Sequence, residues 1–172
     1  MPSVKPILFV FCLTAILSLS LLRADDWPTY RHDSRRSGVS AGTLDFPLSE
    51  SWKVEGGHPR QAWSGPAKWD AYSGNSGLQS MRNFDPSCYV TSADGLVYFG
   101  SSRDNSVHAL DARTGREQWV FFTEAPVRLP PTIHEGIAFA GSDDGYLYAL
   151  DARSGALLWK DRGSPEDRRI PS

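Results

Sequence analysis

Cysteine is almost missing from this sequence. Among 172 residues there are two, Cys12 and Cys88, and they lie far apart along the chain. The sequence therefore holds neither a pair of adjacent cysteines nor the Cys-x-x-Cys-His sequence that attaches haem. Cys88 precedes Tyr89 and Val90, where it fits either a reactive thiol in an exported chain or a small buried hydrophobic residue.

An excess of charge of either sign is also lacking. Lysine and arginine number 18, against 20 aspartates and glutamates. A near-neutral chain has no electrostatic footprint for nucleic acid, so we expect no nucleic-acid partner. A glycine-rich phosphate loop and a nucleophile elbow are both absent, and the four histidines are scattered along the chain. These absences leave no residue that we predict to be catalytic or to bind a metal.

Long apolar runs are limited to one, Ile7 to Leu22, which follows Lys5. With Leu22-Arg23-Ala24 as a cleavage site, residues 1–24 have the form of a secretory signal peptide. An uncleaved membrane anchor is the alternative, although this run is short for a bilayer span. We therefore expect an exported protein, periplasmic or extracellular, that meets the membrane only through this segment.

What the sequence does contain is a repeat. Residues 109–119, Ala-Leu-Asp-Ala-Arg-Thr-Gly-Arg-Glu-Gln-Trp, return 40 positions later at 149–159 as Ala-Leu-Asp-Ala-Arg-Ser-Gly-Ala-Leu-Leu-Trp. Seven of these eleven positions are identical. A second block, 94–101, returns at 135–142 with an offset of 41. A period near 40 residues predicts stacked units of one shape.

Each unit divides into four short β-segments separated by turns. Asp94-Gly95 and Glu135-Gly136 have the form of tight hairpin turns, in which both central residues take positive φ. The Asp-Ala-Arg-Thr/Ser-Gly loop closes with an Asp that bonds a backbone N–H two residues on and a Gly in the left-handed conformation. The expected strands are 88–92, 96–99, 107–110 and one through Trp119, then 131–134, 137–140, 146–150 and one through Trp159.

The segments Leu96 to Phe99 and Ile137 to Ala140 are apolar throughout and do not alternate with polar residues. An antiparallel strand with two apolar faces needs another sheet on each side. Radially packed blades meet that demand. We therefore expect an all-β fold, a partial β-propeller with about two four-stranded antiparallel blades at 88–130 and 131–160 and an N-terminal strand that carries a Trp.

Both copies follow the pattern Ala-x-Asp-x-x-Thr-Gly-x-x-x-Trp, with Ser154 in place of Thr in the second. This pattern resembles the quinoprotein-like (PQQ-like) repeat of β-propellers, as in exported propellers similar to the β-barrel assembly lipoprotein. The resemblance implies that the motif residues serve packing between blades. They are Asp111, Gly115, Trp119, Asp151, Gly155 and Trp159. His108 stands where the copy has Tyr148, which favours a packing role for it as well.

Residues 25–55 precede the repeats. The run Trp-Pro-Thr-Tyr-Arg from Trp27, followed by Arg-Arg-Ser-Gly, is similar to the start of many exported quinoprotein-like propellers. Its arginines fit two hypotheses, an anion site or a solvated turn that packs aromatic side chains on the propeller. The residues concerned are Arg31, Arg35 and Arg36, with Trp27 and Tyr30 as the aromatics.

Leu48 to Val54, with Trp52, is typical of a last strand that lacks its first three strands. Propellers often close by letting an N-terminal strand complete the final blade. We therefore interpret this segment as a ring-closing strand.

Residues 56–87 are a Gly/Pro/Trp-rich insertion relative to the repeat spacing. Long ordered loops are often functional, so Trp63, Trp69 and Tyr72 are candidates for ligand or partner contact by stacking. The alternative is that these aromatic residues pack down as a lid with no ligand. Arg128, in the Pro-rich linker between the blades, is a further candidate contact because it could point into the central channel.

The charged tail, 161–172, contains no third repeat, and two blades do not close a ring. We expect an N-terminal piece of a longer propeller, whose partners are its remaining blades or other proteins. Three functions stay open: a non-catalytic exported binding scaffold, a fragment of a PQQ-dependent quinoprotein dehydrogenase, and a non-functional truncated product. By resemblance, such dehydrogenases need PQQ, calcium and adjacent cysteines. The cysteine pair is absent and Asp143-Asp144 have the form of turn residues, so we expect no cofactor here.

Overall fold

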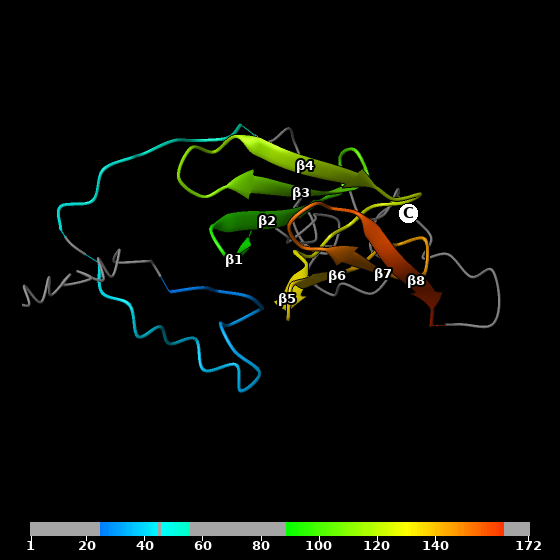
Figure 1. Ribbon diagram of the computed structural model, residues 1–172, viewed down its shortest axis with the longest axis horizontal. Coiled ribbons are helices and arrows are strands. Elements are labelled where there is room, and N and C mark those ends of the chain that lie inside the picture. The colour runs from blue at the N-terminus through cyan, green and yellow to red at the C-terminus, as the bar shows by residue number, and fades with distance from the viewer. Residues whose placement is uncertain (1–24, 45, 56–88, 164–172) are drawn as a thin grey trace, which may run out of the picture.

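The computed structural model describes residues 25–44, 46–55 and 89–163. Eight strands lie in these residues and form two separate four-stranded antiparallel sheets, each in simple sequential order. Figure 1 shows the sheets stacked, with β1–β4 in green above β5–β8 in yellow to orange. No helix in the described ranges is long and apolar enough to cross a membrane. The all-β, partial propeller that the repeat predicts is confirmed.

The strands follow the predicted pattern, with bounds that differ by a few residues. Blade 1 contains β1 (Thr91–Ala93), β2 (Leu96–Ser101), β3 (Ser106–Asp111) and β4 (Glu117–Phe122). Blade 2 contains β5 (Thr132–His134), β6 (Ile137–Gly141), β7 (Tyr146–Asp151) and β8 (Leu157–Arg162). The third and fourth strands of each blade shift register at the same place, Ala109/Leu110 and Ala149/Leu150. The two units are therefore equivalent in register.

The first turn of each blade has the backbone that its sequence predicts. Asp94 and Gly95 have φ of 51° and 79°, and Glu135 and Gly136 have φ of 47° and 76°. Two successive residues at positive φ match the twist of the strands they join, which is why such turns connect short hairpins.

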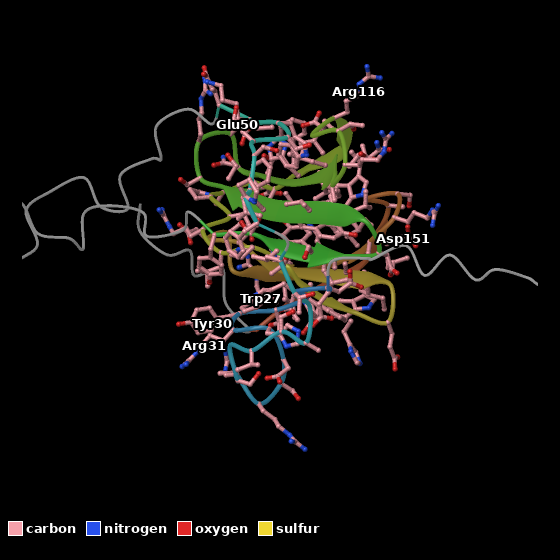
Figure 2. The ribbon with its side chains drawn as sticks, turned by 90° about the vertical axis from the view of Figure 1, so that its left-hand side faces the viewer. Trp27, Tyr30, Arg31, Glu50, Arg116 and Asp151 are labelled. Atoms are coloured by element: carbon pink, nitrogen blue, oxygen red, sulfur yellow. The ribbon has the colours of Figure 1, made fainter. Side chains whose placement is uncertain are left out.

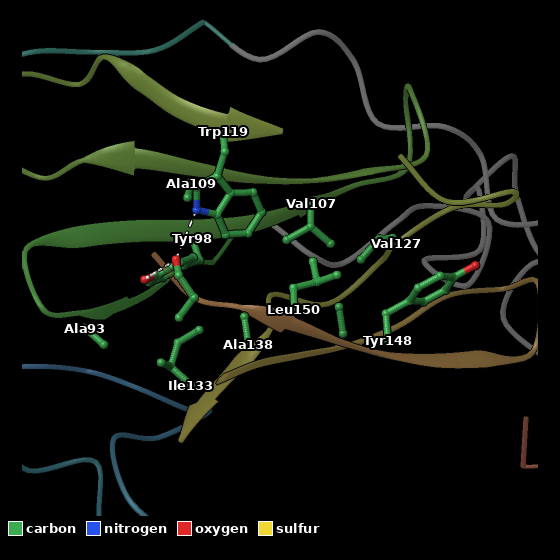
Figure 3. Close-up of a cluster of buried hydrophobic side chains, with 12 residues drawn as sticks. Ala93, Tyr98, Val107, Ala109, Trp119, Val127, Ile133, Ala138, Tyr148 and Leu150 are labelled. Atoms are coloured by element: carbon green, nitrogen blue, oxygen red, sulfur yellow. Dashed lines mark hydrogen bonds between the residues drawn. The ribbon is translucent and has the colours of Figure 1, made fainter. Parts of the chain in front are cut away.

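The core lies between the two sheets (Figure 3). Blade 1 contributes Tyr98, Val107, Ala109 and Trp119, and blade 2 contributes Ile133, Ala138, Tyr148 and Leu150. Val127, in the linker between the blades, is fully buried beside them. Each sheet therefore buries one face against the other, which is one of the two faces that the apolar runs in β2 and β6 predict to be buried.

The inner edge of both sheets is covered by the N-terminal segment. Trp27 forms an isolated antiparallel bridge to Ser92 in β1, with two backbone hydrogen bonds of 2.9 Å. The next residue, Pro28, accepts a 2.8 Å bond from the N–H of Ile133 in β5. Because β1 and β5 are edge strands, their outward backbone groups need partners. Residues 27–28 supply some of these partners and join the two blades along one side.

The predicted ring-closing strand is not a strand in the structure. Residues 46–55 are extended or bent and pair with no strand of the described chain. A last strand needs the third strand of its own blade as a ladder partner, and neither sheet offers that edge here. The expected leader, 1–24, the insertion, 56–87, and the tail beyond Gly163 lie outside the described residues.

Candidate functional site

The Asp-Ala-x-x-Gly loops between the third and fourth strands are held by hydrogen bonds to their own aspartate. Asp111 Oδ1 accepts bonds from the backbone N–H of Arg113 and from the N–H and hydroxyl of Thr114, at 3.1, 2.8 and 2.7 Å. The hydroxyl bond from Thr114, followed by the backbone bond, holds the pKa of Asp111 below its usual value. Ser154 does the same for Asp151, by hydroxyl and backbone bonds of 2.6 and 2.8 Å.

Each loop forms a receptor for a tryptophan, which we call a socket. The first socket is the carbonyl of Ala112 with Gly115, and the second is the carbonyl of Ala152 with Gly155. Both glycines have positive φ, 69° and 72°. The absence of a β-carbon at these positions leaves room for a ring against the loop backbone.

Trp119 of blade 1 fills the second socket. Its indole N–H donates to the Ala152 carbonyl at 3.0 Å, and its ring lies 2.6 Å from the point where a β-carbon on Gly155 would be. The hydroxyl of Tyr98 donates to the same carbonyl at 3.1 Å (Figure 3). The socket therefore joins β2 and β4 of one blade to the loop of the next.

Trp52 fills the first socket in the same way. Its indole N–H donates to the Ala112 carbonyl at 2.9 Å, and its ring lies 2.7 Å from the β-carbon position of Gly115. Residues 46–55 form no strand in the described chain, yet the Trp52 side chain takes the position of a last-strand tryptophan of a preceding blade, and its role in closing a ring stays a prediction.

Trp159 has no socket among the described residues. It is 45% exposed, whereas Trp119 is 8% exposed, and its only ring contact there is with Phe139 at 6.0 Å. We call Tyr98, Val107, Ala109 and Trp119 the Trp119 face, and Phe139, Leu147, Ala149 and Trp159 the Trp159 face. The two sets match in register, since Ala109 and Ala149 each pair with the aromatic residue of the second strand and the Trp of the fourth.

A polar cluster around His108 has the order of a hydrolase triad. His108 Nε2 lies 2.7 Å from Ser106 Oγ, and Nδ1 lies 2.8 Å from Glu117 Oε2. However, Ser106 is fully buried and its hydroxyl donates to Asp104 Oδ1 at 2.6 Å. The His108 ring stacks on Phe99 at 4.7 Å. A nucleophile must be reachable by substrate and must transfer its proton to the histidine, and the buried Ser106 does neither, so this cluster is a partly buried polar network on the sheet.

Asp143 and Asp144 do not fit a calcium site of the kind that PQQ enzymes need. Asp144 is fully buried and accepts from the Tyr148 hydroxyl at 2.7 Å and from two backbone N–H groups. Asp143 Oδ2 lies 2.6 Å from Nε of Arg128, and both side chains are largely buried. No group of three or more His, Cys, Asp or Glu in the described ranges is placed to hold a metal ion. Both acids hold the turn before β7 in place.

The remaining residues that the sequence predicts to contact a ligand or partner lie in the linker, in the insertion and in the N-terminal turn. Arg128 lies in the ion pair with Asp143, and Trp63, Trp69 and Tyr72 lie outside the described residues. In the N-terminal turn, Trp27 is partly buried and packs edge-on against His32 at 5.0 Å, whereas Tyr30 and the arginines are exposed. Figure 2 shows Trp27 beside the sheets, with Tyr30 and Arg31 farther out on the turn. This arrangement favours the solvated turn over the anion site.

Sequence reasoning missed two participants in the sockets. One is the Tyr98 hydroxyl, for which the copy has Phe139, so the repeat itself hides its role. The other is the docking of Trp52, because the insertion between Trp52 and Gly115 makes their separation in the sequence longer than the repeat spacing. Pairing each Trp with the next Asp-Ala-x-x-Gly loop downstream in the sequence would have predicted this contact.

Three solved structures are similar to part of this chain. BamB from Moraxella catarrhalis is 29% identical, with a TM-score of 0.37, over 40% of this chain and 21% of that one. Quinohemoprotein alcohol dehydrogenases from Pseudomonas putida HK5 and Comamonas testosteroni are each 26% identical over 47% of this chain, with TM-scores of 0.43 and 0.42. They are covered over 13% and 14% of their own lengths. The chain thus spans less than a quarter of each relative.

No curated protein sequence matches the chain. A family pattern described as outer membrane protein assembly factor BamB matches residues 50–171. That range begins just before Trp52 and takes in both blades with both sockets. Because the match covers well over half of the 172 residues, the chain belongs to this family of PQQ-like propeller-repeat proteins.

Proposed function

We propose that this chain is an exported, non-catalytic propeller-repeat protein that acts as a binding scaffold, as part of a longer propeller. Its two blades recognise further blades or protein partners through exposed sheet faces. The family description, an assembly factor, supports a role that rests on protein contacts. Export rests on the signal-like segment 1–24, which lies outside the described residues.

The observation that carries the proposal is the exposed Trp159 face. It has the register of the Trp119 face, with the same Ala and Trp, and the Trp119 face is already docked on blade 2. On this face Leu147 and Trp159 are 43% and 45% exposed, which is unusual for large apolar side chains on one face of a sheet. A face with these residues fits a blade that presents a small-residue sheet and an Asp-Ala-x-x-Gly loop.

We propose no quinone cofactor for this chain. A PQQ-dependent dehydrogenase fragment remains the alternative, and its cofactor residues would lie elsewhere. The absence of adjacent cysteines from the sequence supports the non-catalytic proposal, as does the engagement of Asp143 and Asp144 within their own turn. Fluorescence titration with PQQ and calcium tests this point, because saturable one-to-one binding at micromolar concentration would favour the dehydrogenase.

A chain extended by one repeat tests the scaffold proposal. A second copy of residues 123–163 is fused after Gly163, and the indole N–H resonance of Trp159 is followed by nuclear magnetic resonance. We expect its hydrogen exchange to slow to the rate of Trp119. A matched extended chain with Ala in place of the glycine of the new loop should lose this protection. An indole that exchanges equally fast in all three chains would contradict the proposal and leave a non-functional truncated product as the better description.

A further inference from the structure

The first socket is occupied by a side chain that the rest of its segment holds weakly. Within the described residues, the indole bond of Trp52 to Ala112 is the one hydrogen bond that joins residues 46–55 to a blade. Leu48 and Val54 on either side of it are 61% and 50% exposed. Lys53 and Glu55 pair with each other at 3.1 Å within the segment. Trp52 is therefore attached to blade 1 through its own ring.

The second socket differs in this respect. Trp119 belongs to β4, which pairs along its length with β3, so the backbone that carries the ring is fixed in the sheet. Trp52 has no such ladder. The two sockets are thus filled by Trp119, which a strand holds, and by Trp52, which no strand holds. Replacing Trp52 therefore costs less free energy than replacing Trp119.

The chain also carries a tryptophan that fits such a receptor. Trp159 projects from β8 in the register of Trp119, and among the described residues no carbonyl accepts its indole N–H. The first socket, which Trp52 can leave, lies at one end of the two-blade unit. Trp159, which has no socket among the described residues, lies at the other end. This relationship is heterologous, and it joins copies head to tail.

We propose that the Trp159 face of one copy docks on blade 1 of a second copy, with Trp159 entering the first socket in place of Trp52. The contact continues the interface already present between blades 1 and 2. Trp52 then acts as a built-in competitor that keeps the free protein from associating. This inference rests on the proposed function only in assuming that repeat faces recognise one another.

The fit in the second copy is looser than the interface within the chain. Blade 1 presents Phe99 where blade 2 presents Ala140, and His108 where blade 2 presents Tyr148. The larger Phe99 ring holds the incoming sheet farther away, which leaves the Trp and its socket as the main contact. Association is therefore weak while Trp52 is in place, since a competitor reduces the apparent affinity by the fraction of sockets that are open.

Removing the competitor is the first part of the experiment. Sedimentation velocity over a concentration series compares the protein with its Trp52→Ala variant, and circular dichroism verifies that both are folded. We expect the variant to self-associate at least about tenfold more tightly, because its socket is always open. In the Trp52→Ala background, adding Trp159→Ala or Gly115→Ala should abolish the association. Adding Gly136→Ala should not, because Gly136 has a similar φ and no atom within 4 Å of its β-carbon position.

Mixing separates specific docking from general stickiness. The Trp52→Ala/Trp159→Ala chain offers an open socket without a donor, and the unaltered chain offers a donor with a filled socket. We expect neither to associate strongly alone and the mixture to form a one-to-one complex. If the open-socket chain fails to fold, the unaltered protein near millimolar concentration provides the second measurement, in which the indole resonances of Trp52 and Trp159 should shift together.

Three results would overturn the inference: a Trp52→Ala variant that stays monomeric, association that survives Trp159→Ala and Gly115→Ala, or indole resonances that do not respond to concentration. None of these would overturn the proposed function, which stands or falls on the protection of Trp159 in the chain with a third repeat. Conversely, if Trp159 is not protected in the chain with a third repeat but the Trp52→Ala variant still self-associates, the docking between copies stands and the proposed function does not.

Discussion

Tyr98 and Trp119 donate to one carbonyl oxygen, that of Ala152, at 3.1 and 3.0 Å. A carbonyl oxygen has two lone pairs, so both bonds are accommodated without competition. The phenol and the indole are buried, and both come from blade 1 whereas the carbonyl belongs to blade 2. Because of this three-residue junction, the protonation state of the Tyr98 hydroxyl affects the stability of the blade pair.

Burial, followed by the nearby charge of Asp94, raises the pKa of Tyr98 to about 12, above the value near 10 in an unfolded chain. Between these values the folded state holds a proton that the unfolded state has released. Stability from this group is therefore complete below pH 10 and is lost as the pH rises toward 12. We expect Tyr98→Phe to weaken this alkaline decline, measured by urea unfolding at pH 8 to 11.5. Tyr30→Phe, at an exposed position, should leave the decline unchanged.

The two repeat tryptophans should differ in their contribution to stability. Trp119→Ala removes a buried ring and its bond to Ala152, so we expect a loss of roughly 3–5 kcal/mol in the free energy of unfolding. Trp159→Ala removes a half-exposed ring without a socket and should cost about 1 kcal/mol. Chemical unfolding of both variants measures the difference. Equal losses would show that Trp159 is covered in solution, against the exposed face described above.

A methyl group at Gly155 should be costly because it meets the Trp119 ring. We expect Gly155→Ala to lose about 1–3 kcal/mol more than Gly136→Ala, the excess being the cost of overpacking. The two glycines have φ of 72° and 76°, so the cost of placing alanine at positive φ is nearly the same in both. Gly136 has no neighbour within 4 Å of its β-carbon position, and its variant isolates that backbone cost. Matching unfolding free energies for the two variants would mean that the ring moves aside freely.

The bond from Tyr148 to Asp144 should stabilise the turn before β7. Tyr148→Phe leaves a buried carboxylate oxygen without its 2.7 Å hydroxyl donor, which we expect to cost about 1–3 kcal/mol. Tyr146→Phe is the matched control, since its hydroxyl makes no hydrogen bond among the described residues. Asp144→Asn in the Tyr148→Phe background should then cost little further through this bond. A double-mutant cycle of unfolding free energies measures the coupling.

The repeat predicted the fold because its signals are local. Asp94-Gly95 and Glu135-Gly136 set positive φ within two residues, and the Asp loops close through bonds to their own backbone. The apolar runs in β2 and β6 predicted burial on two faces, and their period placed Trp119 and Trp159 at equivalent positions.

The sockets were harder to predict because their partners are distant in sequence. Trp119 meets Ala152 and Trp52 meets Ala112 across 33 and 60 residues. The Trp52 segment has the sequence of a strand but lacks a ladder partner, and propensity alone does not reveal which edge is available. Nor did the sequence separate Trp159 from Trp119, since the difference between them lies in what stands opposite each ring.

The backbone contacts that Trp27 and Pro28 make with the two blades, which we call the clasp, constrain the order in which parts of the chain fold. Each blade is a meander whose contacts are mostly between neighbouring strands, so it can form while few residues separate its partners. The clasp joins positions 65 and 105 residues apart, Trp27 with Ser92 and Pro28 with Ile133. Although residues 27–28 are synthesised before either blade, their partners exist only after both blades have been made. Residues 27–28 thus leave the ribosome ahead of both blades and reach their final position after both have formed.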